Sequence, residues 1–300
     1  MKVRVGVDLG GTKIEAVALD GTGNELDRRR VATPQGDYEG IIGALVALVE
    51  EISAGRDTAA TVGIGTPGAV SPFDGLMKNS NSVVLNGRPL DRDLQKALGR
   101  PMNMRNDADC FALSEAVDGA ARGAATVFGV ILGTGVGGGV VVDGKVRTGP
   151  NRIGGEWGHN PLPWPTDDER PGPDCYCGRR GCIEKWLAGP SLAADHLRVT
   201  GDELTAPGMV EAARSGDGSA AATLDRYVDR LARSLATIVN VLDPDVVVLG
   251  GGMSNVDELY ERVPRIWGRY VFGGEVATRL VRNRHGDSSG VRGAAMLVEQ

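Results

Sequence analysis

Three of the four cysteines in this chain lie within eight residues of one another, at Cys175, Cys177 and Cys182. Thiols this crowded form a disulfide, bind a metal or remain as inert reduced cysteines. The chain begins with an apolar strand pattern and without a signal peptide, so we expect a reducing compartment, where structural disulfides are rare. With His159 sixteen residues upstream, the C-x-C-x₄-C spacing supplies the Cys₃His donor set of a closed structural zinc site. We therefore predict zinc bound by these four residues, and a buried thiol at Cys110.

Glycine is the outstanding compositional feature, because its 45 residues gather in short groups after apolar runs. Three such turns could present backbone N–H groups to phosphate oxygens, although each alone is also typical of an ordinary tight turn. They are Asp8-Leu9-Gly10-Gly11-Thr12-Lys13, Gly133-Thr134-Gly135 and Gly250-Gly251-Gly252-Met253. The third leaves room for a flat ligand such as adenine. None has the G-x-x-x-x-G-K-[ST] or strand-linked G-x-G-x-x-G spacing, so the sequence supports neither a P-loop nor a Rossmann site.

The first two turns belong to an internal repeat. Residues 129–144 match residues 6–21 at seven of sixteen positions without a gap, at a constant offset of 123. Each copy reads as a β-hairpin that ends at Asp-Gly. Helical spacing over residues 38–53, 219–242, 256–271 and 291–298 alternates with strand patterns at 61–65 and 246–249. Alternating strands and helices predict an α/β fold in which the second half repeats the first.

Length and charge narrow the class of protein. Three hundred residues suit two lobes that share one cleft. The formal charge of -6 predicts no basic surface for nucleic acid, so we expect no nucleic-acid partner. No apolar stretch approaches the length of about 20 residues that a membrane-spanning helix needs, so we expect no membrane association and a cytoplasmic location.

Several motifs together resemble one family, the ROK sugar kinases of the actin and hexokinase superfamily. They are the opening DLGGTK, Gly63-Ile64-Gly65-Thr66-Pro67-Gly68, Asn106-Asp107-Ala108, Gly133-Thr134-Gly135, Glu156-Trp157-Gly158-His159, the cysteine motif and Gly250-Gly251-Gly252. The resemblance covers essentially the whole chain. It implies two ribonuclease-H-like lobes with a cleft between them. Residues 1–117 would form the sugar and phosphate lobe, residues 118–289 the nucleotide lobe with a zinc loop at 159–184, and residues 290–300 a helix that packs back on the first lobe.

The resemblance also implies where ATP and Mg²⁺ bind. ATP would lie between the lobes, with the first two turns at its phosphates and the third near adenosine. The implied nucleotide-binding residues are Asp8, Gly10, Gly11, Thr12, Lys13, Gly133, Thr134, Gly135, Gly251 and Gly252. Asp8 is expected to associate with Mg²⁺ through water, because Mg²⁺ gives up its water ligands reluctantly.

Phosphoryl transfer needs a carboxylate at the attacking hydroxyl. Asp107 matches the family's general base within the Asn-Asp-Ala motif, and Asn106 is placed to bind a neighbouring hydroxyl. Taken alone, Asp107 would suit a helix N-cap better. The family often has Asp before this Asn and Asn two residues after the base. Here Arg105 and Asp109 occupy those positions, so the flanking contacts differ.

The implied sugar contacts come from several segments of the chain. They are Asn81, Asn106, Asp107, Glu156, His159 and Glu184. A closed zinc site has no open position for water, so we expect the zinc to position His159, Glu156 and Glu184 and not to catalyse. Val84 stands where relatives commonly have an aromatic residue, so we expect no sugar stacking there.

Within the family, the chain looks most similar to the bacterial fructokinase branch. The segments that carry this similarity are Lys78-Asn79, Leu85-Asn86-Gly87, 114–120, 158–164 and 285–293. They imply an ATP-dependent kinase, expected as a homodimer, that phosphorylates the 6-hydroxyl of fructose. Glucose and N-acetylated hexosamines are the alternative substrates.

Two readings from other classes are also open. One is a sugar-responsive regulator of the same family without its DNA-binding domain. Such regulators carry an N-terminal DNA-binding domain, whereas only seven residues precede Asp8, so we expect a kinase. The other is a non-kinase ATPase of the wider superfamily, against which the cysteine motif and Glu156-Trp157-Gly158-His159 argue.

Overall fold

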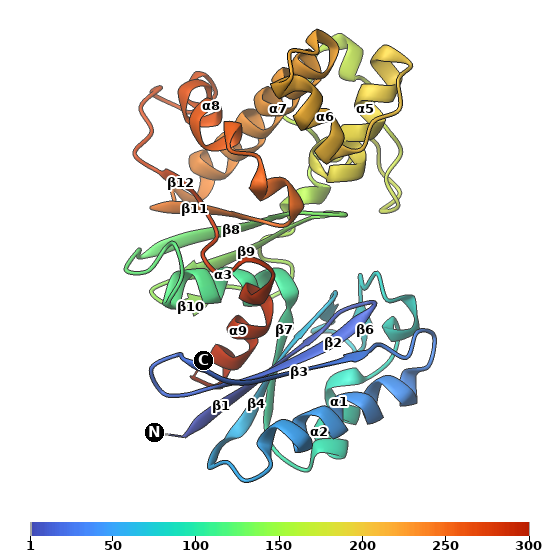
Figure 1. The fold of residues 1–300 in the computed structure, drawn as a ribbon, viewed down its shortest axis with the longest axis vertical. Helices are drawn as coiled ribbons and strands as arrows, with labels where there is room; N and C mark the ends of the chain where they lie inside the picture. The colour runs from blue at the N-terminus through green and yellow to red at the C-terminus, as the bar shows by residue number, and fades with distance from the viewer. Residues whose placement is uncertain (1, 300) are drawn as a thin grey trace. The chain divides into compact units, whose positions relative to one another are not determined.

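The computed structural model describes residues 2–299 and divides into two compact units. The first unit is formed by the residues up to 123, from 139 to 155 and from 284 onward. The second is formed by residues 124–138 and 156–283. Each unit is built on a five-stranded mixed sheet with helices packed against it (Figure 1).

The sheet of the first unit has the strand order β3-β2-β1-β4-β7. Its strands are β1 (Val3–Leu9), β2 (Lys13–Leu19), β3 (Glu25–Ala32), β4 (Thr58–Thr66) and β7 (Met102–Asn106). β1 runs antiparallel to β2 and parallel to β4, and β4 runs parallel to β7. The helices of this unit are α1 (Tyr38–Ser53), α2 (Leu90–Leu98), α3 (Asp107–Val117) and α9 (Ser289–Met296), and a small hairpin joins β5 (Ala69–Val70) to β6 (Met77–Lys78).

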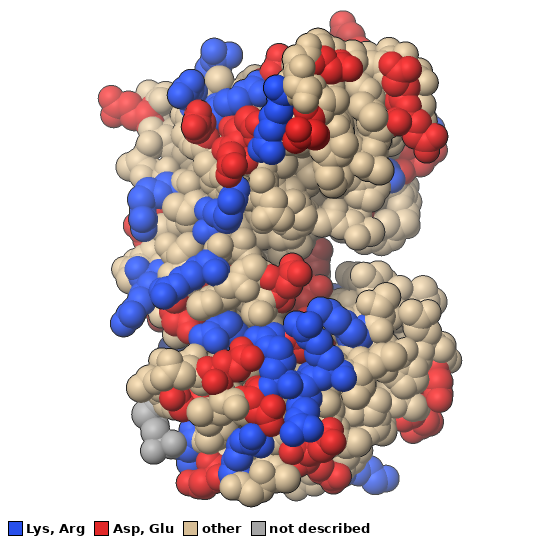
Figure 2. Space-filling view, viewed as in Figure 1, with Lys and Arg blue, Asp and Glu red and all other residues tan. Residues whose placement is uncertain are grey.

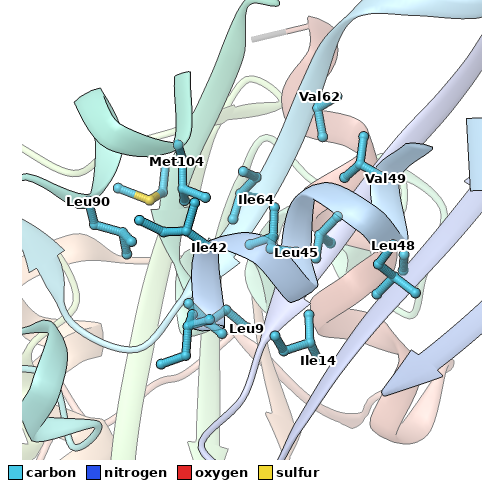
Figure 3. Close-up of a cluster of buried hydrophobic side chains, with 14 of the residues drawn as sticks. Leu9, Ile14, Ile42, Leu45, Leu48, Val49, Val62, Ile64, Leu90 and Met104 are labelled. Carbon is cyan, nitrogen blue, oxygen red and sulfur yellow. The ribbon is translucent and has the colours of Figure 1, made fainter. Parts of the chain in front are cut away.

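Alternation along the strands decides which helix covers which face of this sheet. Successive strand side chains point to opposite faces. Val7 and Leu9 of β1 and Ile14 of β2 belong to a core cluster with Ile42 and Leu45 of α1, which Figure 3 shows from close range. Through this apolar cluster, α1 and α2 pack against one face of the sheet.

On the other face, glycines let α9 approach the strands. A Cβ added to Gly6 of β1 would lie 2.2 Å from the backbone N of Ala295, and one added to Gly63 of β4 would lie 1.7 Å from the carbonyl O of Ala294. Val17 and Leu19 of β2 complete the contact with α9. The C-terminal helix thus packs on the strand that begins the chain.

The sheet of the second unit has the order β10-β9-β8-β11-β12, and residues 139–146 at its edge group with the first unit. Its strands are β8 (Thr126–Leu132), β9 (Val136–Val142), β10 (Lys145–Val146), β11 (Val246–Gly250) and β12 (Arg279–Arg282). The helices of the second unit are α4 (Glu184–Leu187), α5 (Gly189–Thr200), α6 (Ala206–Arg214), α7 (Gly218–Leu242) and α8 (Glu258–Ile266). Asp217 caps the start of α7 through the N–H groups of Ser219 and Ala220, and Asp243 ends it in the left-handed conformation.

The two sheets repeat one topology, which confirms the predicted duplication. β8 and β9 begin and end 123 residues after β1 and β2, the same offset as in the sequence repeat. In each sheet a hairpin is followed by an edge strand on one side and by two parallel strands on the other. The mixed α/β fold with duplicated sheets is therefore the one that the sequence predicts.

The predicted helix at 256–271 is shorter in the structure. α8 ends at Ile266, with Pro264 in its last turn, and a 3₁₀ turn at Trp267–Arg269 follows it. Proline removes a backbone donor and clashes with the preceding turn, which weakens the C-terminal part of this helix. Among the described residues, no helix is long and apolar enough to cross a membrane.

Basic and acidic side chains adjoin one another over the first unit, on the face drawn in Figure 2. On the edge strand β3, Arg28 pairs with both Glu15 and Glu25, and Arg30 Nε lies 2.9 Å from Glu15 Oε2. These arginines thus pair with acidic side chains of β2 and β3.

Candidate active site and metal cluster

The first glycine turn joins β1 to β2. The N–H of Gly10 donates to the carbonyl of Lys13 at 3.0 Å, and a Cβ on Gly10 would lie 2.8 Å from that oxygen, so only glycine fits the turn. Thr33 Oγ1 donates to the Gly10 carbonyl at 2.7 Å and fastens the turn to the end of β3. Gly11 and Thr12 remain exposed. Their N–H groups suit an anionic ligand, as the sequence predicts for this turn.

Lys13 follows this turn but is not a free cation. Its Nζ lies 3.3 Å from Glu15 Oε2, while the Glu15 carboxylate is also held by two arginines of β3. The lysine side chain is about half exposed. An incoming phosphate would therefore compete with Glu15 for Lys13.

Asp8 is the penultimate residue of β1, next to this turn, and its setting disfavours its charge. Burial, followed by the negative charges of Asp107 and Glu15, raises the pKa of Asp8 to about 7. Gly65 and Gly290 make room for the carboxylate, because a Cβ on either would approach an Asp8 oxygen to 3.4 Å. A bound cation would stabilise the ionised form, so the setting suits a carboxylate that serves a metal ion.

Asp107 lies at the same edge of the sheet as Asp8, where β7 passes into α3. Asn106 caps α3 by accepting from the N–H of Ala108 at 2.9 Å, and its amide donates to the Gly68 carbonyl at 3.3 Å. Asp107 Oδ1 accepts from the same N–H at 2.8 Å. Parallel strands β1, β4 and β7 end side by side, which explains how residues almost one hundred positions apart influence each other's charge.

Asn81 lies in an exposed loop of the same unit, after β6. Asn86 shapes this loop, because its side-chain oxygen accepts from the N–H of Ser80 and its amide donates to the Ser80 carbonyl, both at 2.9 Å. Ser82 Oγ would lie 3.5 Å from a Cβ on Gly11, so the loop reaches the first glycine turn. In the sequence Asn86 carries only the family resemblance, because no local pattern marks a side chain that bonds the backbone six residues away.

The second and third glycine turns lie together in the second unit. A Cβ on Gly251, whose φ is 78°, would lie 2.6 Å from the carbonyl of Leu132, immediately before the second turn. Both turns border a pocket of 890 Å³. Its other lining residues are largely apolar and include Pro190, Ala206, Pro207, Val210, Met253 and Val256. Apolar walls beside exposed glycine backbone suit a flat aromatic base that carries a phosphate chain.

His159, Cys175, Cys177 and Cys182 form one cluster, as predicted from the spacing. Their ligand atoms all lie within 4.8 Å of one another. Cys175 Sγ is 3.6 Å from His159 Nδ1, and Cys177 Sγ is 3.6 Å from Cys182 Sγ. Tetrahedral zinc with bonds of about 2.3 Å to sulfur and 2.0–2.1 Å to nitrogen separates its ligands by about 3.6–3.8 Å. The donor set and both spacings fit zinc, whereas a disulfide would bring two sulfurs to about 2.05 Å.

Glu156, His159 and Glu184 come together around this cluster. The N–H of Ile183 donates to the carbonyl of Asn160 at 2.9 Å, so the segment after His159 runs beside the one that leads into Glu184. Glu184 Oε2 accepts from the N–H of Val136 at 3.0 Å, which fixes the carboxylate beside the second glycine turn. The six predicted sugar contacts thus form two groups, Asn81, Asn106 and Asp107 in the first unit and these three in the second.

A buried charge network anchors the segment that leads to the cysteines. Glu169 accepts from Arg230 Nε at 2.7 Å and from Arg233 at 2.9–3.0 Å, and Arg233 also donates to the carbonyl of Trp164 at 2.6 Å. The side chains of Arg230 and Arg233 are 1% and 3% exposed. The sequence did not predict this network, because nothing local pairs a loop glutamate with arginines more than sixty residues away.

The family model of the ROK family matches residues 4–300. The chain belongs to the ROK family. Among curated relatives of this ROK protein, N-acetyl-D-glucosamine kinases from Photobacterium profundum and Vibrio cholerae are 38% and 39% identical, each over 97% of this chain and 98% of the relative.

Two solved structures resemble the ROK chain over nearly its full length. The ROK hexokinase from Thermus thermophilus has a TM-score of 0.86 at 36% identity and covers 99% of this chain and 97% of its own. A ROK glucokinase from Streptomyces griseus, solved with glucose and AMPPNP, has a TM-score of 0.78 at 30% identity over 99% of both chains. The two-lobed hexokinase fold implied by the resemblance is confirmed.

Proposed function

We propose that this ROK protein is an ATP-dependent kinase that phosphorylates the 6-hydroxyl of N-acetyl-D-glucosamine. The observation that carries the proposal is the 38–39% identity, over almost the whole length of both chains, to two N-acetyl-D-glucosamine kinases. At the level of the class the chain is a sugar kinase. The 6-hydroxyl is the primary alcohol of this sugar, outside the ring, and is its least hindered acceptor.

The substrate expected from the sequence was fructose. The motifs at Lys78-Asn79 and 285–293 suggested it, but these relatives support the alternative, an N-acetylhexosamine kinase of the same family. Two of the motifs concerned shape a loop or hold α9, through Asn86 and Ser289, and contacts of that kind do not depend on which sugar is bound. Similarity in those segments therefore indicates family membership more reliably than it indicates the substrate.

The proposed nucleotide site combines the second and third glycine turns with the apolar pocket beside them. The pocket would take the adenine, while the exposed backbone at Thr134 would face the phosphates. The Gly133 N–H donates to the Gly135 carbonyl at 3.0 Å and shapes the turn. Exposed backbone donors hold phosphate oxygens without a charged side chain. The neighbouring glucokinase, solved with AMPPNP, is consistent with a nucleotide site in this fold.

In the first unit, Asp107 is proposed as the general base. Its place at the N-terminus of α3 fixes the carboxylate, because Asn106 caps the helix and the Ala108 N–H holds one oxygen. Asp107 would accept the proton of the sugar hydroxyl as that oxygen attacks the γ-phosphorus. Asp8 would hold a water ligand of Mg²⁺, and the ion would neutralise charge on the phosphates.

The cysteine cluster is proposed as a structural zinc site. Cys175, Cys177, Cys182 and His159 would hold the ion, which would supply four bonds that fix the loop geometry. Because Ile183 is bonded to Asn160, a rigid cluster would also hold Glu184 and Glu156 for hydrogen bonds to sugar hydroxyls.

Other expectations stay predictions, among them a homodimer, a cytoplasmic location and the absence of a nucleic-acid partner. A ROK transcriptional regulator also resembles the chain, with a TM-score of 0.83, but at 21% identity that likeness concerns the fold alone. The regulator is therefore the weaker of the two functions.

The test of the proposed function is ADP release over a panel of acceptors with purified protein, ATP and Mg²⁺. We expect the highest kcat/KM with N-acetyl-D-glucosamine, followed by N-acetylmannosamine and glucose, with fructose last. Asp107→Asn purified in parallel is the matched control for a contaminating kinase. A higher kcat/KM for fructose than for N-acetyl-D-glucosamine would overturn the proposal and restore the expectation from the sequence.

A further inference from the structure

Tyr176 stands between two of the cysteines and contacts the one histidine of the cluster. Its Oη lies 2.9 Å from His159 Nε2, and the two rings meet edge to face, with centroids 5.1 Å apart at an angle of 89°. The other ring nitrogen, His159 Nδ1, lies 3.6 Å from Cys175 Sγ. The two nitrogens of His159 therefore face different partners, one inside the cluster and one outside it.

Because the two ring nitrogens of His159 face different partners, the position of the ring proton is determined. A neutral histidine carries one N–H, and the nitrogen that binds a metal ion must be unprotonated. With Nδ1 directed to the cluster, the proton belongs on Nε2, where the Tyr176 hydroxyl oxygen is placed to accept it. Histidine ligands usually give this second N–H to a carboxylate, a carbonyl or water. Here a phenol from the ligand loop itself occupies that place.

We propose that Tyr176 is a positioning residue that sets the tautomer and ring orientation of His159 and thereby retains the metal ion. The inference rests on the proposed zinc site and adds a residue that the donor spacing does not predict. The turn around Tyr176 is held by its backbone, since Cys175 N–H donates to Arg179 at 2.8 Å and Gly178 N–H donates to Cys175 at 3.0 Å. The phenol is thereby kept within reach of His159, although the residue is 78% exposed.

The same hydroxyl links the metal cluster to the proposed sugar contacts. Having accepted from His159, it keeps its own hydrogen and can donate outward. Glu184 begins α4 two residues after Cys182, and Glu156 lies three residues before His159. Because it engages His159 Nε2, the Tyr176 hydroxyl lies beside the sugar contact predicted for that histidine. Loss of that hydroxyl should weaken metal retention and raise the sugar KM, with kcat less affected.

Tyr176→Phe keeps the ring and removes only the acceptor oxygen. Because Tyr176 is exposed, we expect the variant to fold like the wild type. Zinc-loaded protein is mixed with excess 4-(2-pyridylazo)resorcinol, and release of the ion is followed by absorbance. We expect zinc release about 10–100-fold faster than from the wild type. This factor is the loss of metal affinity that usually follows when the hydrogen-bond partner of a metal ligand is removed. Tyr270→Phe is the matched control, because its hydroxyl donates to Asp229 at 2.7 Å in the same unit.

Absorption of the cobalt-substituted protein gives a second readout, since its d–d bands report the ligand geometry. Altered bands in Tyr176→Phe and unchanged bands in Tyr270→Phe would support the positioning role. Zinc release from Tyr176→Phe at the wild-type rate would overturn it. A wild-type chain that binds no zinc would also overturn it, yet leave the sugar panel as an independent measure of kinase activity.

Discussion

Replacing Asp8 by asparagine should make the ligand-free protein more stable at pH 8 while impairing its function. The ionised carboxylate is unfavourable in the folded protein, because burial and the charge of Asp107 raise the pKa of Asp8 to about 7 from an ordinary 3.8. At 1.36 kcal/mol per pH unit, this difference corresponds to at most about 4 kcal/mol. Asp8 retains partial exposure and asparagine also needs partners, so we expect a gain of about 2–4 kcal/mol in the free energy of unfolding.

The pH dependence has a definite sign. Because the folded pKa exceeds the unfolded one, the folded wild type binds more protons between pH 3.8 and 7 and loses stability as pH rises through that window. Asp8→Asn does not titrate there, so its advantage should grow from about pH 4 to 7 and level off by pH 8. Mg²⁺ with nucleotide should reduce the difference in stability between Asp8→Asn and the wild type, since the cation stabilises the ionised wild-type carboxylate.

Urea unfolding followed by far-UV circular dichroism is the suitable assay. Tryptophan fluorescence would report on the second unit, because every tryptophan lies between Trp157 and Trp267, whereas Asp8 belongs to the first unit. Asp20→Asn is the control of opposite sign. Hydrogen bonds from Thr22 and Asn24 lower the pKa of Asp20 to about 2, so that carboxylate stabilises the fold at neutral pH. An Asp8→Asn protein no more stable than the wild type at pH 8, or one whose advantage shrinks as pH rises, would refute the reasoning.

Three further changes follow from other contacts. Asp107→Asn should lower kcat by about 10²–10⁴-fold with sugar affinity largely kept, and a near-normal kcat in a coupled ADP assay would mean that another group takes the proton. Glu169→Ala should cost about 1.5–3 kcal/mol in urea unfolding, because it removes a carboxylate shared by two buried guanidinium groups that keep Asp195 and Asp229 as partners. Glu258→Ala, at a more exposed pair, should cost less than about 1 kcal/mol. The arginines also lower the pKa of Glu169 to about 2, so its contribution should be present above pH 4.5 and be lost as pH falls toward 2, and equal acid sensitivity of Glu169→Ala and the wild type would contradict this. Gly63→Ala should cost at least about 1–3 kcal/mol by thermal unfolding, because its Cβ would overlap a carbonyl of α9, while Gly43→Ala, with no neighbour within 4 Å, should be neutral or stabilising.

The sequence alone determined the repeat, the fold class and the family. An offset of 123 residues placed both hairpins, because apolar alternation and Gly or Asp-Gly turns are local signals that survive without knowledge of the fold. The Cys175, Cys177 and Cys182 spacing likewise predicted the cluster that the structure forms with His159, since three of its four donors come from one short loop.

Only the tertiary structure decided the energetics around those residues. The raised pKa of Asp8 depends on burial and on the charge of Asp107. The two carboxylates are near each other because the ends of their strands are aligned, which sequence spacing does not show. The burial of Arg230 against Glu169 and the contact of Tyr176 with His159 also depend on where distant segments pack. Local patterns determine which elements form. Burial, the direction of a side chain and the charge of a neighbour are set by contacts between elements, and no local pattern encodes them.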